Sequence, residues 1–375
     1  MTSASMPSDG AIDATIAGDV YAIFAFDIGF QVDLDRAEPL VDQASRSRVV
    51  RARRPAPVWF DYSPVPLRLV VEGAPVSVDD RETAPEAEML VYDFGAALLT
   101  YRIPLPSRFA DLVPLGCALY DHEALRDDAR ERVRRVIETI RPAIERAALA
   151  ASSEDYVIFA ITDWEGASVD DLIERHRHDL ARAIEAERVT LSTEQAHRST
   201  EGRMSYAADD AAIIDWNGAV LFDAAPEDVI SVLKHANIEL LELRVLDEEL
   251  DEILDHADET LASITSSRFW PGFASGRMLR RFASVQTDAA VLFEGVNNAI
   301  KLLGNQYLAR LYRLSASRLD LPAWQESVQR KLDATESLYQ KMSDGTSTRR
   351  LETLEWVIIA LIAVSIILPF TPWYH

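Results

Sequence analysis

Short alternating or continuous runs of apolar residues dominate the first half of the chain and predict β-strands. Each run is rich in β-branched or aromatic residues, and the expected strands cover residues 19–30, 64–72, 88–104 and 155–162. Within residues 211–223, the dipeptide Asn217-Gly218 divides two apolar runs. Both of its residues tolerate positive φ, so the pattern predicts a tight hairpin.

Two amphipathic helices are expected among these strands. Apolar residues recur at steps of three and four over residues 121–150, which predicts a helix that bends at Pro142. Its other face alternates Arg with Asp and Glu, as is typical of a solvated, ion-paired surface. Ser168, followed three positions later by Asp171, indicates the start of a second helix over residues 169–187.

The periodicity changes after residue 225. Ten apolar residues from Leu233 to Ile264 follow one another at steps of three or four, which predicts one long helix with a coiled-coil-like seam. A break near Pro271 precedes a second expected helix over residues 278–317. A third helix is expected from Asp320, because Pro322 suits the first turn of a helix.

The last apolar stretch predicts a membrane anchor. Residues 356–370 read WVIIALIAVSIILPF, and ten of these fifteen residues are Val, Ile, Leu or Phe. A helix of nineteen residues would cover about 28 Å, close to the bilayer core of about 30 Å. Trp and Tyr near both borders suit the headgroup level. The anchor residues are Trp356, Val357, Ile358, Ile359, Leu361, Ile362 and Trp373.

Basic residues on one side of this stretch predict its orientation. Lys341, Arg349 and Arg350 precede it, and positively charged flanks stay on the cytoplasmic side. We therefore expect a single-pass membrane protein with the bulk of the chain in the cytoplasm, and contact of Arg349 and Arg350 with lipid headgroups. The alternative is that the stretch forms a buried helix at the end of a large domain.

Together these patterns predict an α+β fold class in four parts. Residues 1–17 are expected to form a disordered leader, and residues 18–224 an α+β domain with a mostly antiparallel sheet. Residues 225–348 are expected to form a helical hairpin or coiled-coil-like bundle. Residues 354–374 complete the chain as a transmembrane tail anchor.

Composition narrows the choice of partners. The formal net charge of -23, from 61 acidic and 38 basic residues, argues against nucleic acid as a partner. A single cysteine, Cys117, excludes an internal disulfide and a cysteine-rich zinc site. A basic patch at residues 46–54 is interpreted as a solvated edge or loop, with contact to anionic lipid headgroups as the alternative.

Few residue patterns point to catalysis. The helix positions of His235, Glu239 and Glu242 could place an imidazole and two carboxylates near one metal ion. Eight acids between Asp247 and Glu259 are interpreted as a solvated or partner-binding face. The chain contains no Walker loop, GxGxxG, GxSxG or HExxH motif. We therefore assign no catalytic residue, no metal and no cofactor.

Other side chains have simple structural interpretations. His176 is expected at the edge of the core, and Cys117 as a buried, inert thiol. The pairs Asp163-Trp164 and Asp215-Trp216 close predicted strands and are interpreted as turn-forming and packing residues.

The run Leu354-Glu355-Trp356, followed by VIIALIA, resembles the tail of the "required for meiotic nuclear division" family of membrane-associated proteins. The order of an α+β region, paired long helices and one terminal membrane segment is also similar. That family's tail tends to carry a glutamate inside the membrane stretch, where this chain has Ser365. The resemblance implies a membrane-bound organiser rather than an enzyme.

The sequence thus favours a non-catalytic scaffold or tether. Its expected partners are the lipid bilayer, proteins that the sequence does not identify, and further copies of the chain through the seam. The alternative is a membrane-associated enzyme with a carboxylate and histidine metal site.

Overall fold

The computed structural model describes residues 14–43, 49–51, 64–266 and 306–338, together with residues 284, 285, 287, 289 and 340. The chain divides into two compact units. One consists of Met1–Val245 and Val291–Trp324, and the other of Leu246–Ala290 and Gln325–His375. The candidate site lies entirely in the first unit.

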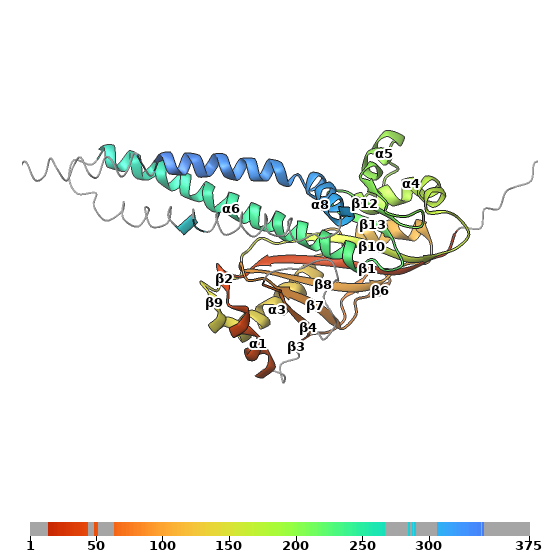
Figure 1. The fold of residues 1–375 in the computed structure, drawn as a ribbon, viewed down its shortest axis with the longest axis horizontal. Helices are drawn as coiled ribbons and strands as arrows, with labels where there is room; N and C mark the ends of the chain where they lie inside the picture. Colours follow the sequence, from red (N-terminus) through yellow and green to blue (C-terminus); the bar gives the residue numbers. More distant parts are fainter. Residues whose placement is uncertain are drawn as a thin grey trace, which may run out of the picture. The chain divides into compact units, whose positions relative to one another are not determined.

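A nine-stranded sheet forms the centre of the first unit (Figure 1). Its order is β11-β12-β13-β10-β1-β8-β7-β4-β3. The strands are β1 (Ile16–Asp27), β3 (Val49–Arg51), β4 (Leu67–Glu72), β7 (Glu86–Val91), β8 (Ala96–Pro104), β10 (Glu154–Trp164), β11 (Arg203–Met204), β12 (Ala211–Ile214) and β13 (Gly218–Phe222). All neighbours are antiparallel except β10 and β13, which are parallel. The predicted α+β class with a mostly antiparallel sheet is confirmed.

Four two-residue strands and the helices complete this unit. The two-residue strands are β2 (Gln31–Val32), β5 (Ser77–Val78), β6 (Arg81–Glu82) and β9 (Ile144–Glu145). The helices are α1 (Leu34–Gln43), α2 (Leu112–Leu119), α3 (Glu123–Ile140), α4 (Val169–Glu185), α5 (Thr193–Glu201), α8 (Gln306–Arg318) and the first part of α6 (Glu227–Ser266), with 3₁₀ turns η1 (Phe109–Asp111) and η2 (Arg141–Ala143).

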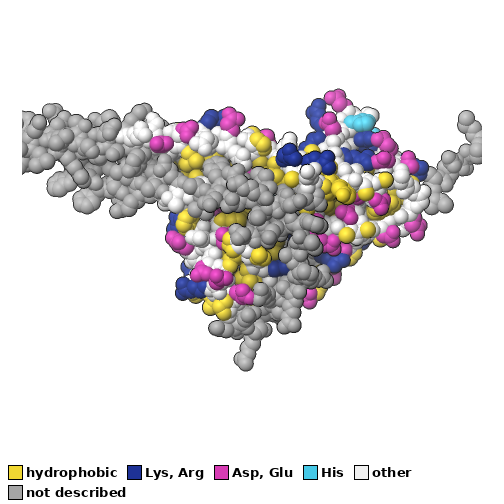
Figure 2. Space-filling view, in the orientation of Figure 1, with side chains coloured by type: hydrophobic (Ala, Val, Ile, Leu, Met, Phe, Trp, Pro, Cys, Tyr) yellow, Lys and Arg dark blue, Asp and Glu magenta, His cyan; other side chains and the backbone are white. Residues whose placement is uncertain are grey.

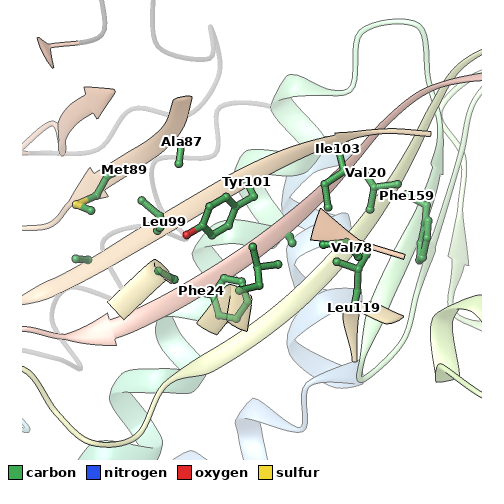
Figure 3. Packing of buried hydrophobic residues seen from close by; sticks show 14 of the residues in the cluster. Val20, Phe24, Val78, Ala87, Met89, Leu99, Tyr101, Ile103, Leu119 and Phe159 are labelled. Carbon is green, nitrogen blue, oxygen red and sulfur yellow. The ribbon is translucent and has the colours of Figure 1, made fainter. Parts of the chain in front are cut away.

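Both faces of the sheet are covered, which explains the nearly continuous apolar sequence of β1. Val20 and Phe24 point to a core shared with Leu119 of α2 and with residues of α3 and α4 (Figure 3). The opposite face packs against α6, whose Lys234 reaches Glu88 of β7. The sheet is therefore the middle layer of three.

The expected helix over residues 121–150 is shorter than predicted. It ends at Ile140, and Pro142 lies in the 3₁₀ turn that leads into β9. Proline lacks the N–H that would continue the helix, and it disfavours helical geometry in the preceding residue. The proline therefore ends this helix instead of bending it.

The hairpin expected at Asn217-Gly218 is present between β12 and β13, where the Asp215 N–H donates to the Gly218 carbonyl at 3.0 Å. The predicted hairpin is confirmed, and it forms without positive φ at Asn217 or Gly218. The start of α4 is confirmed, since the Ser168 side chain accepts a hydrogen bond from the Asp171 N–H.

In the second unit, α6 continues from Leu246 and neighbours a helical segment over residues 325–338. Ser327 donates to Asp247 at 3.1 Å, and Lys331 Nζ lies 2.6 Å from a carboxylate oxygen of Asp251. Contacts from Ser327 to Asp247 and from Lys331 to Asp251 run in the same direction along both segments, so the two segments are parallel. They cannot be the two arms of one hairpin.

None of the helices in the described ranges combines the length and the apolar character needed to cross a bilayer. The predicted anchor at 354–374, with Arg349 and Arg350, lies outside the described residues, as do the leader at 1–13 and most of the basic patch at 46–54.

Candidate functional site

A cavity of about 180 Å³ lies in the first unit, beside the amino end of β10. Five elements form its walls: the end of α2, the start of β10, the end of α4, the β12–β13 turn and α6. The lining residues are Gly116, Tyr120, Glu154, Asp155, Val157, Ala183, Ile184, Ala186, Trp216, Asn217, Asn237, Leu240 and Arg244.

Strand register brings the β12–β13 turn to this place. Val157 of β10 pairs with Gly218, so the parallel arrangement sets the turn beside the start of β10. The Tyr156 hydroxyl donates to the Asp215 carbonyl at 2.9 Å and holds the turn. Trp216 at its tip therefore has a fixed backbone next to the cavity.

Helices α2 and α4 approach closely at one wall. A Cβ placed on Gly116 would lie 2.4 Å from the carbonyl oxygen of Ala183, so only glycine fits here without a shift. Tyr120 follows as the C-cap of α2, with its N–H donating to the Gly116 carbonyl at 3.1 Å. Helix α4 ends at Glu185, and its C-cap Ala186 has the left-handed φ of 56°.

Replacing Gly116 by alanine tests this close approach. In an open helix, alanine stabilises relative to glycine by up to about 1 kcal/mol. Here the clash with Ala183 should reverse the sign and lower the free energy of unfolding by about 1–3 kcal/mol. Chemical denaturation of the full chain in a nonionic detergent measures the change, and a gain in stability would contradict the contact.

The cavity has an acidic wall with one paired and one exposed carboxylate. Arg244 lies 2.6 Å from Glu154, and its guanidinium carbon lies 5.6 Å from the centre of the Trp324 ring. Asp155 is exposed. Among the described large hydrophobic residues, Tyr120 and Trp216 are unusually exposed, at 59% and 44%. Two aromatic rings and a solvent-accessible carboxylate thus share one small cavity.

A second feature is a row of buried polar side chains on α6. Lys234 is 6% exposed and lies 2.7 Å from Glu88, which Arg68 also contacts. Burial alone raises the pKa of Glu88, but the charges of Lys234 and Arg68 outweigh it and hold that pKa below its usual value. This pairing fixes α6 against β7.

The three residues considered as a metal set lie on α6, where two of them, His235 and Glu239, are buried beside Tyr312 of α8. His235 and Glu239 are 4% and 1% exposed, and Glu239 accepts a hydrogen bond from the Tyr312 hydroxyl of α8. The His235 ring lies 5.7 Å from the Tyr312 ring, and burial lowers the pKa of His235 to about 4, so its imidazole is neutral at pH 7. Glu242 is partly exposed, although its Oε1 is buried. Within the described ranges, no group of three His, Cys, Asp or Glu side chains could hold a metal ion.

The structure also bears on the interpretations of His176, Cys117 and the acidic run of α6. The core-edge role of His176 is confirmed, because its ring stacks on Phe109 at 4.1 Å. Cys117 is only partly buried, contrary to expectation. In the acidic run of α6, Asp247 and Asp251 both pair with Lys331, so this part of the run is ion-paired. On the face drawn in Figure 2, acidic and basic side chains are interspersed among the described residues.

Sequence reasoning missed the cavity. It treated Trp216 as a packing residue and did not connect Tyr120 or Asp155 with it. The only local sign of the cavity was the position of the Trp216 indole at the tip of an expected hairpin. Such loops lie at the surface, where a large apolar side chain has few neighbours to pack against. The gathering of these residues depends on the parallel β10–β13 pair, which the sequence did not predict.

The fold defines an α+β protein with a three-layer arrangement around one large sheet. The chain belongs to the family described as "Uncharacterized protein MJ0711, N-terminal domain", which matches residues 17–228. The matched range contains the sheet and helices α1–α5, and it ends in the first turn of α6.

A relative in this family is the "Uncharacterized protein MJ0711" of Methanocaldococcus jannaschii. It is 22% identical over 220 residues, which represent 57% of this chain and 65% of the relative. The match thus spans just under two thirds of the relative's length. No solved structure matches the chain.

Proposed function

We propose that the protein is a membrane-anchored, non-catalytic tether that presents its α+β domain on the cytoplasmic side. The observation that carries this proposal is the stretch from Trp356 to Tyr374, which contains no Asp, Glu, Lys or Arg. Its ten Val, Ile, Leu and Phe residues contribute about -3 to -6 kcal/mol to insertion, at about -0.3 to -0.6 kcal/mol each.

The helices that precede this stretch support a tether. Helix α6 is continuous from Glu227 to Ser266 and contributes residues to both compact units. In the second unit it has a parallel helical neighbour over residues 325–338, joined to it through Lys331. Paired helices of this kind suit a spacer between a folded domain and a bilayer, within a larger helical bundle.

The chemistry of α6 also favours a structural role. Its histidine and its carboxylates could have served an enzyme, but Glu239 is engaged by Tyr312 and Lys234 by Glu88. These side chains hold the helix to the sheet and to α8. The resemblance of the tail to the "required for meiotic nuclear division" family agrees with a membrane-bound organiser.

Membrane fractionation tests the anchor. The full chain should remain in the membrane pellet after alkaline carbonate extraction, whereas a chain truncated after Thr348 should be recovered in the supernatant. Changing Ile359 and Ile362 to aspartate should also release the chain, because each change costs about 3–4 kcal/mol and the two together cancel the insertion energy. Changing both residues to leucine is the matched control and should leave the chain in the pellet.

Equal recovery of the full and truncated chains in the soluble fraction would overturn the anchor. The tether itself is tested by affinity purification of the full chain from detergent-solubilised membranes. It should recover the same protein partners in independent preparations, and failure to recover any reproducible partner would contradict the tether even where the anchor is upheld.

A further inference from the structure

We propose that the cavity beside the amino end of β10 binds a small organic ammonium ion. This inference goes beyond tethering and does not depend on where the protein is located. It stands on the cavity's size, on two exposed aromatic side chains and on the charge of its acidic wall.

The volume limits the ligand to a small molecule. A cavity of about 150 Å³ in another protein holds benzene, so about 180 Å³ accommodates roughly six to eight non-hydrogen atoms. Choline, with seven such atoms, is of this size. A nucleotide or a sugar phosphate is too large to be enclosed.

The lining favours a cation. Arg244 and Glu154 pair with each other at 2.6 Å and together carry no net charge. Asp155 adds an exposed carboxylate, so the walls have a net negative charge. Burial raises the pKa of the Asp155 carboxyl above its usual value, and the charge of Arg126, which is itself paired with Asp121 at 2.6 Å, opposes that shift.

The aromatic residues favour an organic cation over a metal ion. Trp216 and Tyr120 line the cavity and are 44% and 59% exposed. The face of an aromatic ring attracts an alkylammonium group, and tryptophan is the strongest such partner. A hydrated metal ion would instead require several oxygen ligands. The Asn217 and Asn237 amides at the other walls can accept a hydrogen bond from a ligand hydroxyl.

Equilibrium dialysis of the full chain in a nonionic detergent tests the proposal, with radiolabelled choline as the probe. Choline should bind with one site per chain. Its neutral isostere 3,3-dimethyl-1-butanol, in which carbon replaces the charged nitrogen, should compete at least tenfold more weakly. Equal competition by the isostere would show that charge is not recognised and would overturn the proposal.

Two variants locate the site. Trp216→Ala should weaken choline binding about tenfold, and Asp155→Asn should weaken it and reduce its sensitivity to salt. Both residues are exposed, so both variants should keep the wild-type thermal midpoint. The matched controls are Tyr206→Ala and Glu194→Gln, which change an exposed tyrosine and an exposed acid that do not line this cavity.

A competition experiment distinguishes a lipid headgroup from the free ammonium ion as the ligand. Phosphatidylcholine added to the mixed micelles should displace labelled choline if the cavity accepts lipid headgroups, and should leave it bound if the cavity accepts only the free ion. Either result upholds an ammonium site. Absence of choline binding, or affinities unchanged in both Trp216→Ala and Asp155→Asn, would refute it.

Discussion

Replacing Arg132 by leucine is expected to lower the free energy of unfolding by about 3–5 kcal/mol, because it removes a buried charge that several groups depend on. The Arg132 side chain is completely buried. Its guanidinium donates to the backbone carbonyls of Val71, Pro85 and Ala74 at 3.0, 3.0 and 2.9 Å, and its Nε donates to Asp128 at 2.6 Å.

Leucine would fill part of the volume but would remove the guanidinium donors, and the Pro85 carbonyl would keep only the hydrogen bond from the Gly73 N–H at 2.9 Å. Each buried carbonyl that loses its hydrogen bond costs about 1–3 kcal/mol. Asp128 would lose the hydrogen bond from Arg132 but keep the one from the Tyr101 hydroxyl at 2.6 Å. Arg132→Lys should fall between wild type and leucine, because a single ammonium group cannot reproduce the planar fork of a guanidinium.

The control lies on the same helix. Arg134 is half exposed and pairs only with Glu131 among the described contacts, so Arg134→Leu should change the free energy of unfolding by less than about 1 kcal/mol. Denaturant titration of the full chain in a nonionic detergent, followed by circular dichroism, measures all three variants. Equal losses for Arg132→Leu and Arg134→Leu would show that the buried network adds nothing.

Arg132 also shows what the sequence could not reveal. The apolar stripe of α3 was identified from its periodicity, and its core residues Val133, Val136 and Ile140 are all buried. The opposite face was interpreted as solvated throughout, which is wrong for Arg132. Its burial depends on a chain segment near Gly73, about sixty residues earlier, where a Cβ would lie 2.3 Å from the guanidinium carbon. Periodicity along one helix contains no information about such a distant partner.

The same limit applies to α6 and to the cavity. The sequence predicted a long helix with an apolar seam, and the structure has one from Glu227 to Ser266. It did not predict that residues 232–241 are buried on every side, because that requires both the sheet and α8. The cavity likewise depends on how five separate elements meet, and only the hairpin among them had a distinctive sequence signal.

Burial of a carboxyl group on α6 leads to the second large expected effect, a change in the pH dependence of stability. Burial, with a smaller contribution from the charge of Asp27, raises the pKa of Glu242 well above its usual value of 4.5. Its Oε1 has no hydrogen-bond partner within the described part of the chain. The folded protein therefore holds a proton on Glu242 at pH values where the unfolded chain has released it.

The sign follows from proton linkage. Because the folded state binds the extra proton, the free energy of unfolding falls as the pH rises above the unfolded value of about 4.5, by up to about 1.4 kcal/mol per pH unit, until the folded pKa is passed. Glu242→Gln removes this term, since the amide resembles the protonated acid and does not titrate. The variant should match the wild type near pH 4 and become progressively more stable than it towards pH 8.

Denaturant titrations of both proteins at pH 4 to 8 measure the difference. Glu248→Gln, at an exposed position of the same helix, controls for the loss of one negative charge from a chain with a net charge of -23. That control should shift stability by a small amount that is similar at each pH above 5. Curves for wild type and Glu242→Gln that remain parallel across the range would mean that Glu242 is ionised in the folded protein, which would require a compensating positive charge beside it.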